Sequence, residues 1–277
     1  MMNNGNVQKN KEVISFLMAT QLQRLWKGFA AAAILSIVPF LLHPQFTEYL
    51  LPYEIQLYLN PYYRYGVWLI FFGLAFFCLH DVYYWRANFR VLTPYQQIPV
   101  SSFKQYISWI FSVTCIFALY FLWQILLFIV FYQITMVKQP DLALTNGLYF
   151  SAQNALFAKL YIPVTLKEGI LWMIRMFVYA FLTVFFGSGL HMIRKHRILS
   201  ILFLILLFSY IGIWFLPVKI LYSIPPEMLQ HFTWVSYSTQ IYHIFMYGCE
   251  GVFLLCALLL IFREYRKEKG MQYEKIS

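Results

Sequence analysis

Hydrophobic residues in this chain run in six long segments that short polar loops separate. A membrane-spanning helix needs about 20 mostly apolar residues, and each of the six meets or approaches that length. The segments cover about 26–42, 66–85, 106–134, 169–192, 198–216 and 244–262. The third is so long that it must tilt or extend beyond the bilayer. The pattern predicts an all-α integral membrane protein, with six transmembrane helices in a single transmembrane domain over residues 1–277.

The residues before the first span have a helical pattern of their own. Apolar residues of segment 9–25 fall near one helix face, with Ser15, Gln23 and Arg24 away from it. The apolar set is Ile14, Leu17, Met18, Leu22 and Leu25. Such a face predicts an N-terminal amphipathic helix lying in the membrane interface. The alternative is a cytoplasmic extension of the first span.

The segment between the fifth and sixth spans, 217–243, is too apolar for an ordinary solvated loop. It follows a span that ends at Pro217, and it contains the pair Pro225-Pro226. We therefore expect a partly re-entrant, helical excursion into the membrane.

Composition agrees with the membrane assignment. Hydrophobic residues make up 61% of the chain and charged residues 12%, with a mean hydropathy of +0.62, whereas a soluble domain carries about 25% charged residues. The net charge of +10 comes from lysines and arginines that gather in alternate loops, above all 86–104, 194–197 and the basic tail 263–277. The positive-inside rule then places both termini in the cytoplasm of a multi-pass cell (plasma) membrane protein.

Charged residues inside spans are costly and are functional candidates by default. Three are expected here: Asp81, Arg175 and Glu250. Arg175 and Glu250 each lie about six residues from the outer end of their spans, so at 1.5 Å per residue they share a depth. We expect them to pair, because a paired charge costs less to bury. Asp81 lies near the inner end of the second span, where it can reach headgroups or a partner helix.

Motifs for catalysis and cofactor binding are missing from the sequence. It contains no HExxH, no GxSxG and no P-loop, so we expect no catalytic residues, no metal site and no bound cofactor. The four cysteines, all in apolar stretches, are interpreted as small buried hydrophobic residues. Its basic runs do not interleave aromatics as a nucleic-acid interface would. We therefore expect no enzyme and no nucleic-acid partner.

The loop between the second and third spans carries the most specific signal. Its sequence from Leu92 to Ile107, LTPYQQIPVSSFKQYI, resembles a run that many permease subunits of type-2 ABC transporters, the exporter class, place there. The number of spans, the N-terminal amphipathic helix and the apolar segment before the last span also resemble this family. The first outer loop is longer and more aromatic than is typical of members.

The resemblance implies that 92–105 is a cytoplasmic coupling loop whose helix docks in a groove of a separate ATPase. The coupling residues it implies are Ile98, Pro99, Val100, Ser101, Phe103 and Lys104. Phe103 and Ile98 would anchor the helix and Lys104 would lie at the rim. Two ATPase subunits would hold the ATP and Mg²⁺, and a second permease copy or a paralogue would complete the transporter.

Two other classes of protein remain open. One is a membrane-embedded enzyme acting on lipids, which would need His80, Asp81 and His191 to meet in a polar cavity. The other is a non-catalytic membrane scaffold or immunity protein. For an exporter, the many aromatic residues favour an amphipathic or lipid-like cargo such as a peptide, drug or lipid.

Overall fold

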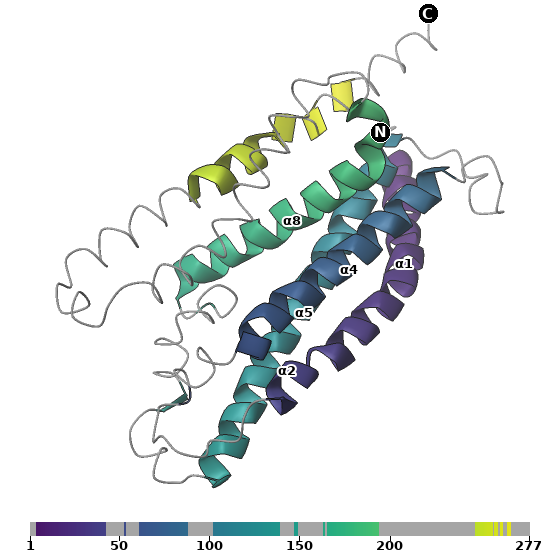
Figure 1. Ribbon diagram of the computed structural model, residues 1–277. Helices are drawn as coiled ribbons and strands as arrows, with labels where there is room; N and C mark the ends of the chain where they lie inside the picture. The colour runs from purple at the N-terminus through teal and green to yellow at the C-terminus, as the bar shows by residue number, and fades with distance from the viewer. Residues whose placement is uncertain are drawn as a thin grey trace, which may run out of the picture. The chain divides into compact units, whose positions relative to one another are not determined.

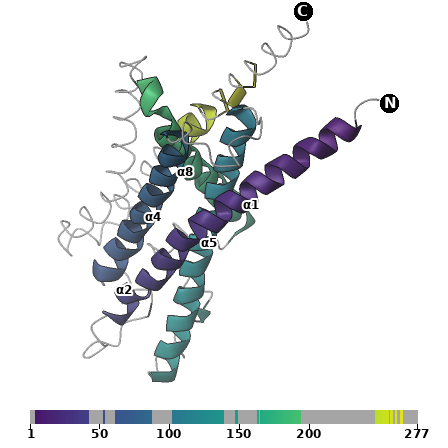
Figure 2. The ribbon, with the colours of Figure 1, turned by 90° about the vertical axis from the view of Figure 1, so that its right-hand side faces the viewer.

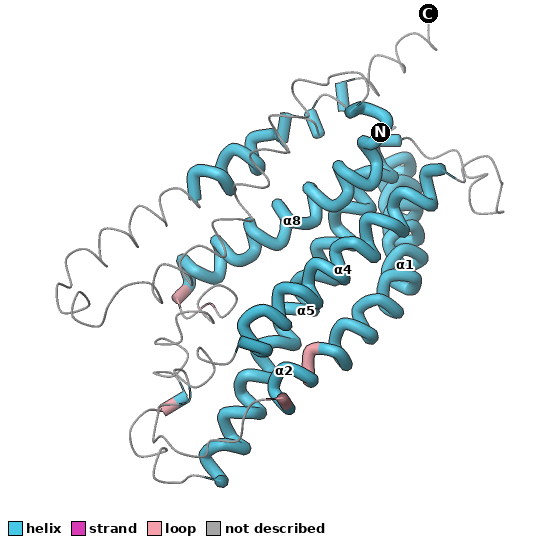
Figure 3. The backbone as a smooth tube through the Cα atoms, in the orientation of Figure 1, coloured by secondary structure: helices cyan, strands magenta, loops and turns pink. Residues whose placement is uncertain are grey.

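The computed structural model describes residues 4–42, 53, 61–87, 102–138, 147–148, 163 and 165–193, and parts of 247–266. Almost all of these residues are helical, and there is no strand among them (Figure 3). The predicted all-α class is therefore confirmed. Residues 1–188 form one compact unit and 189–277 another.

Four helices of the described part are long and apolar enough to cross a membrane. They are α1 (Asn4–Leu35), α4 (Pro61–Ala87), α5 (Ser102–Lys138) and α8 (Leu166–Ile193) (Figure 1). α4, α5 and α8 contain the predicted spans 66–85, 106–134 and 169–192, whereas α1 overlaps the first predicted span, 26–42, only over 26–35. Helices of this length and apolar content are those of a membrane protein. The fifth predicted span and the expected re-entrant segment lie outside the described residues. Within the sixth, the structure describes a shorter apolar helix, Tyr247–Cys256.

The helices alternate in direction. Gln21 of α1 meets Ser108 of α5, and Ala33 further along α1 meets Trp123, so α1 and α5 run the same way. By contrast, Tyr120 of α5 meets Val67 of α4, and the α5 ring before it, Phe117, meets Phe71. α4 is therefore antiparallel to α5. The three helices at the first three predicted spans thus alternate in direction, as successive crossings of a bilayer would.

α1 is one helix of 32 residues that continues without a break through segment 9–25 (Figure 2). The predicted apolar face is the packed one: Leu17 and Leu25 are buried, whereas Ser15, Gln23 and Arg24 are exposed. A continuous helix is what we expect if segment 9–25 is an extension of the first span, which was the alternative to a separate interfacial helix. The location of the first half of α1 at a membrane surface stays a prediction.

The first span is interrupted near its end, where Pro39 cannot donate a backbone hydrogen bond. α1 ends at Leu35, a turn follows, and α2 (Val38–Leu41) begins with Pro39 in its first turn. The break frees the Ala33 carbonyl, which accepts hydrogen bonds from Ser36 Oγ at 2.8 Å and Trp123 Nε1 at 3.0 Å. The indole of α5 therefore satisfies the backbone group that the break releases.

Aromatic rings fill the middle of the packing between α4 and α5. Phe71 lies with its centroid 5.0 Å from that of Phe117 and 4.9 Å from that of Phe121. The Tyr120 hydroxyl donates to the Val67 carbonyl at 2.6 Å. Since lipid is as apolar as these rings, the contact depends on close van der Waals packing and such hydrogen bonds.

α8 begins with a capping box and packs on α4 through a small residue. Thr165 N donates to Glu168 Oε2 and Glu168 N donates to Thr165 Oγ1, at 3.1 and 3.2 Å, so two backbone donors at the helix start are satisfied. Near the other end, a Cβ on Gly187 would lie 2.9 Å from the Leu79 carbonyl oxygen. Only glycine permits this approach of the two backbones.

Candidate functional site: a polar junction at the start of α5

α5 begins inside the segment that the sequence analysis assigned to coupling. Phe103 and Lys104 lie in its first turn, and both side chains are partly exposed. Ile98, Pro99, Val100 and Ser101 lie outside the described residues. The helix then continues for 37 residues to Lys138. The C-terminal part of the predicted coupling segment is therefore the first turn of a long, unbroken helix.

A buried polar cluster lies one to two turns further along α5. The side-chain amide of Gln21 lies 2.7 Å from Ser108 Oγ and 2.9 Å from Ser112 Oγ. With the amide nitrogen facing these hydroxyls, its oxygen accepts a hydrogen bond from Trp109 Nε1 at 3.2 Å. This orientation gives both ends of the amide a partner. Because all four residues are buried, we expect the cluster to hold α1 and α5 in a fixed register.

An ion pair lies one turn along α1 from this cluster. Arg24 Nη2 donates to Asp81 Oδ1 at 2.7 Å, joining α1 to α4. The Asp81 side chain is 14% exposed and the Arg24 side chain 45%. Of the two partners that the sequence analysis considered for Asp81, headgroups or a helix, the structure provides the helix. The exposure of Arg24 places the pair at the border of the packed region.

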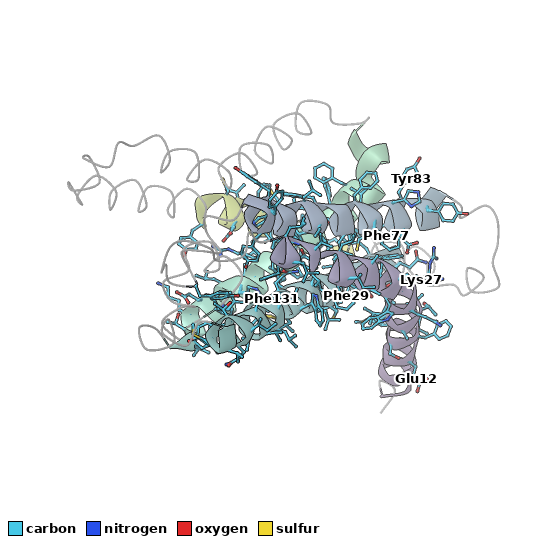
Figure 4. All side chains as sticks on the ribbon, turned by 60° about the horizontal axis from the view of Figure 1, so that its bottom comes forward. Glu12, Lys27, Phe29, Phe77, Tyr83 and Phe131 are labelled. Carbon is cyan, nitrogen blue, oxygen red and sulfur yellow. The ribbon has the colours of Figure 1, made fainter. Side chains whose placement is uncertain are left out.

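α1 and α4 approach closely just beyond the ion pair. A Cβ on Gly28 of α1 would meet the ring of Phe77 of α4. Figure 4 labels Phe77 on α4 and the chain neighbours of Gly28, Lys27 and Phe29, on α1. The ion pair and this contact fix α4 against α1, while Gln21 fixes α5 against α1. We call Gln21, Arg24, Asp81, Ser108 and Ser112 together the polar junction.

The other predicted polar residues occupy different places. Arg175 lies in α8 and Glu250 in the helix Tyr247–Cys256, and both side chains are buried. They belong to different units of the chain, so their pairing stays a prediction.

The enzyme alternative required three side chains to meet. Asp81 instead pairs with Arg24, and the His80 ring is stacked on Tyr84. The side chain of His191 lies outside the described residues. Among the residues that were described, no group of three or more His, Cys, Asp or Glu side chains could hold a metal ion.

Sequence reasoning missed Gln21, Ser108 and Ser112. Signals for them were present: Gln21 lies on the same helix face as Leu17 and Leu25, where a lone amide interrupts an apolar stripe. Ser108 and Ser112 are four residues apart, so they share a helix face. A pattern search for polar residues within apolar faces would have found all three.

No family model, curated protein or solved structure matches this chain. Its function must therefore be argued from its own residues.

Proposed function

We propose that this protein is the membrane-spanning permease subunit of an ATP-driven ABC exporter. The observation that carries the proposal is the position of α5. The segment resembling a coupling helix leads directly into an unbroken helix of 37 residues, about 55 Å long at 1.5 Å per residue. Because α5 is unbroken over this length, a displacement at its first turn can be transmitted along the helix toward the far side of a bilayer.

The polar junction supports the same proposal. It joins the first turns of α5 to α1 through Gln21, and α1 to α4 through Arg24 and Asp81. A push on Phe103 and Lys104 would therefore move three helices together. Such a joint suits a permease, which has no energy source of its own and depends on closure of its ATPase subunits.

The rest of the proposal concerns partners and location. Two copies of an ATPase subunit would hold ATP and Mg²⁺, and a second permease or a paralogue would face this chain. Both termini and the coupling segment would lie in the cytoplasm, at the cell membrane. The cargo would be amphipathic or lipid-like, in keeping with an aromatic content of 21%.

Affinity purification of the full-length chain from its native membrane tests the coupling role. We expect the eluate to contain a chain with a Walker sequence and to hydrolyse ATP. Phe103→Glu should remove that activity from the eluate, because a charge in an apolar groove is costly. The matched control is Phe16→Glu, which changes an exposed aromatic of α1 outside the coupling segment.

Two results would contradict the proposal. The first is an eluate of the wild-type chain without ATP hydrolysis. The second is equal retention of the ATPase by Phe103→Glu and by Phe16→Glu, with both variants monodisperse in detergent.

A further inference from the structure

The contact between α1 and α4 has an inner and an outer side. On the inner side both helices meet α5, through Gln21 of α1 and Phe71 of α4. The outer side is turned away from α5. Lys27 lies there on α1, three residues after Arg24 and four before Ala31, so the three are neighbours on one helix face. All three are exposed.

α4 contributes a matching row to the outer side. Gly73, Phe77 and Tyr84 follow one another at intervals of four and seven residues, so they share a helix face, and all are exposed. Phe77 lies against Gly28 of α1, which places this row beside α1. Lys27 and Phe77 are labelled in Figure 4. We call the following residues the outer seam: Arg24, Lys27 and Ala31 of α1, and Gly73, Phe77 and Tyr84 of α4.

The ion pair between Arg24 and Asp81 lies at a level that has the residues of a membrane surface. Trp26 of α1 and Tyr83 and Tyr84 of α4 are within three residues of the pair, and all three rings are exposed. Exposed Trp and Tyr gather where lipid headgroups meet the hydrocarbon. We therefore expect headgroups at this level, and acyl chains along the deeper parts of α1 and α4.

Positive charge is in excess at this level. Arg24 donates one hydrogen bond to Asp81, from Nη2, and its side chain stays 45% exposed, so guanidinium N–H groups remain for a second acceptor. Lys27 forms no hydrogen bond or ion pair with the residues that the structure describes. Two cations thus face one carboxylate. A phosphate group accepts hydrogen bonds from both kinds of cation and matches this excess.

Further into the spans, the outer seam is apolar and open. The Phe77 side chain is 38% exposed, and nothing lies within 4 Å of a Cβ at Gly73. Ala31 of α1 is small and exposed. A bare phosphate ion would leave this apolar strip unused, whereas the acyl chain of a lipid would cover it.

We propose that the outer seam binds an acidic phospholipid, whose phosphate lies between Arg24 and Lys27. The acyl chain follows the apolar strip past Gly73. A headgroup with a net negative charge matches the positive charge that Asp81 leaves unneutralised. The proposal goes beyond the proposed function, because it depends on the membrane location of the chain and not on an ATPase partner.

Native mass spectrometry of the full-length chain in detergent tests the site. Phosphatidylglycerol and phosphatidylcholine with identical acyl chains are the two probes, and titration gives their affinities. We expect the wild-type chain to bind phosphatidylglycerol more tightly. Lys27→Gln should lower that affinity about fivefold, the factor that one cation contributes near a lipid surface. Lys167→Gln is the matched control, since it removes an exposed lysine at the start of α8.

Asp81→Asn should raise the affinity for phosphatidylglycerol. The change removes the negative charge that repels the headgroup, and it releases the Arg24 guanidinium from its ion pair. A variant that only loosened the packing of α4 on α1 would bind less lipid. An increase therefore separates an electrostatic role from a structural one.

Gly73→Trp tests the path of the acyl chain. The indole fills the open space at this position, so the affinity for phosphatidylglycerol should fall while the thermal unfolding midpoint stays the same. Inorganic phosphate in excess should not displace the lipid, because it has no apolar part.

Equal affinities for the two lipids, or an unchanged affinity in the Lys27→Gln variant, overturn the site. A lower affinity in the Asp81→Asn variant does the same. Displacement by inorganic phosphate overturns the lipid in favour of a free anion. Loss of self-association together with lipid binding in the Lys27→Gln variant overturns the site in favour of a contact between copies.

Discussion

Gln21 of α1 and Gln124 of α5 are both buried glutamines, and their surroundings are opposite. Gln21 lies among two serine hydroxyls and an indole N–H that together satisfy its amide. Gln124 lies further along α5 with neither amide atom hydrogen-bonded. The first glutamine joins two helices, and the second lies at a level where the packing is chemically incomplete.

The difference follows the length of α5. At its start, polar groups fix α5 and α1 in one register. At the level of Gln124, an unsatisfied amide costs about 1–3 kcal/mol, although the adjacent Trp123 still joins α5 to α1 through its hydrogen bond to the Ala33 carbonyl.

Gly187→Ala should have the largest effect, because it forces α4 and α8 apart at a point where their backbones approach closely. The new Cβ would lie 2.9 Å from a backbone oxygen of Leu79 and 3.0 Å from Cβ of Val82. Backbone cannot move aside as a side-chain end can, so we expect a loss of about 1–3 kcal/mol. Thermal unfolding in detergent measures it.

Gly73→Ala is the control for this change, since nothing lies within 4 Å of a Cβ at that position in α4. It should leave stability unchanged or raise it by up to about 1 kcal/mol through helix propensity. Equal losses in both variants would show that the contact between α8 and α4 is not the cause.

Leucine in place of each glutamine should change stability in opposite directions. Gln21→Leu leaves two hydroxyls and the Trp109 indole without their amide, and we expect a loss of about 1 kcal/mol. The loss is limited because serine hydroxyls can turn to carbonyls of their own helix. Gln124→Leu removes an unsatisfied amide and should stabilise by about 1 kcal/mol. The unfolding midpoints of the two variants decide the comparison, and a shift of the same sign in both would contradict it.

Hydropathy was enough to predict α4, α5 and α8. The spans expected at 66–85, 106–134 and 169–192 lie inside α4, α5 and α8, because length and apolar content alone decide whether a helix can cross a bilayer. Helix ends were less accurate. The third span was predicted to start at Tyr106, but the helix α5 starts at Ser102. Residues 102–105 of the coupling segment extend the helix beyond its apolar part.

Contacts between helices could not be predicted in the same way. The sequence marked Asp81 as a candidate, yet its partner Arg24 is 57 positions away in the chain, and only packing brings the two together. Gln124 was overlooked too, although as a lone amide in an apolar span it carries the same signal as Gln21. The lack of a hydrogen-bond partner for its amide depends on how α5 packs against its neighbours, which the sequence does not give.

The ion pair between Arg24 and Asp81 should have the smallest effect. Arg24 is nearly half exposed, so solvent screens the pair, and exposed pairs contribute about 0.2–1 kcal/mol. A double-mutant cycle with Arg24→Gln and Asp81→Asn isolates the interaction between the two side chains. We expect a coupling energy below about 1 kcal/mol that falls further in high salt. A coupling energy of several kcal/mol that does not change with salt would instead show that the pair lies in a dry environment. The polar junction would then hold α1, α4 and α5 together more strongly than the exposure of Arg24 indicates.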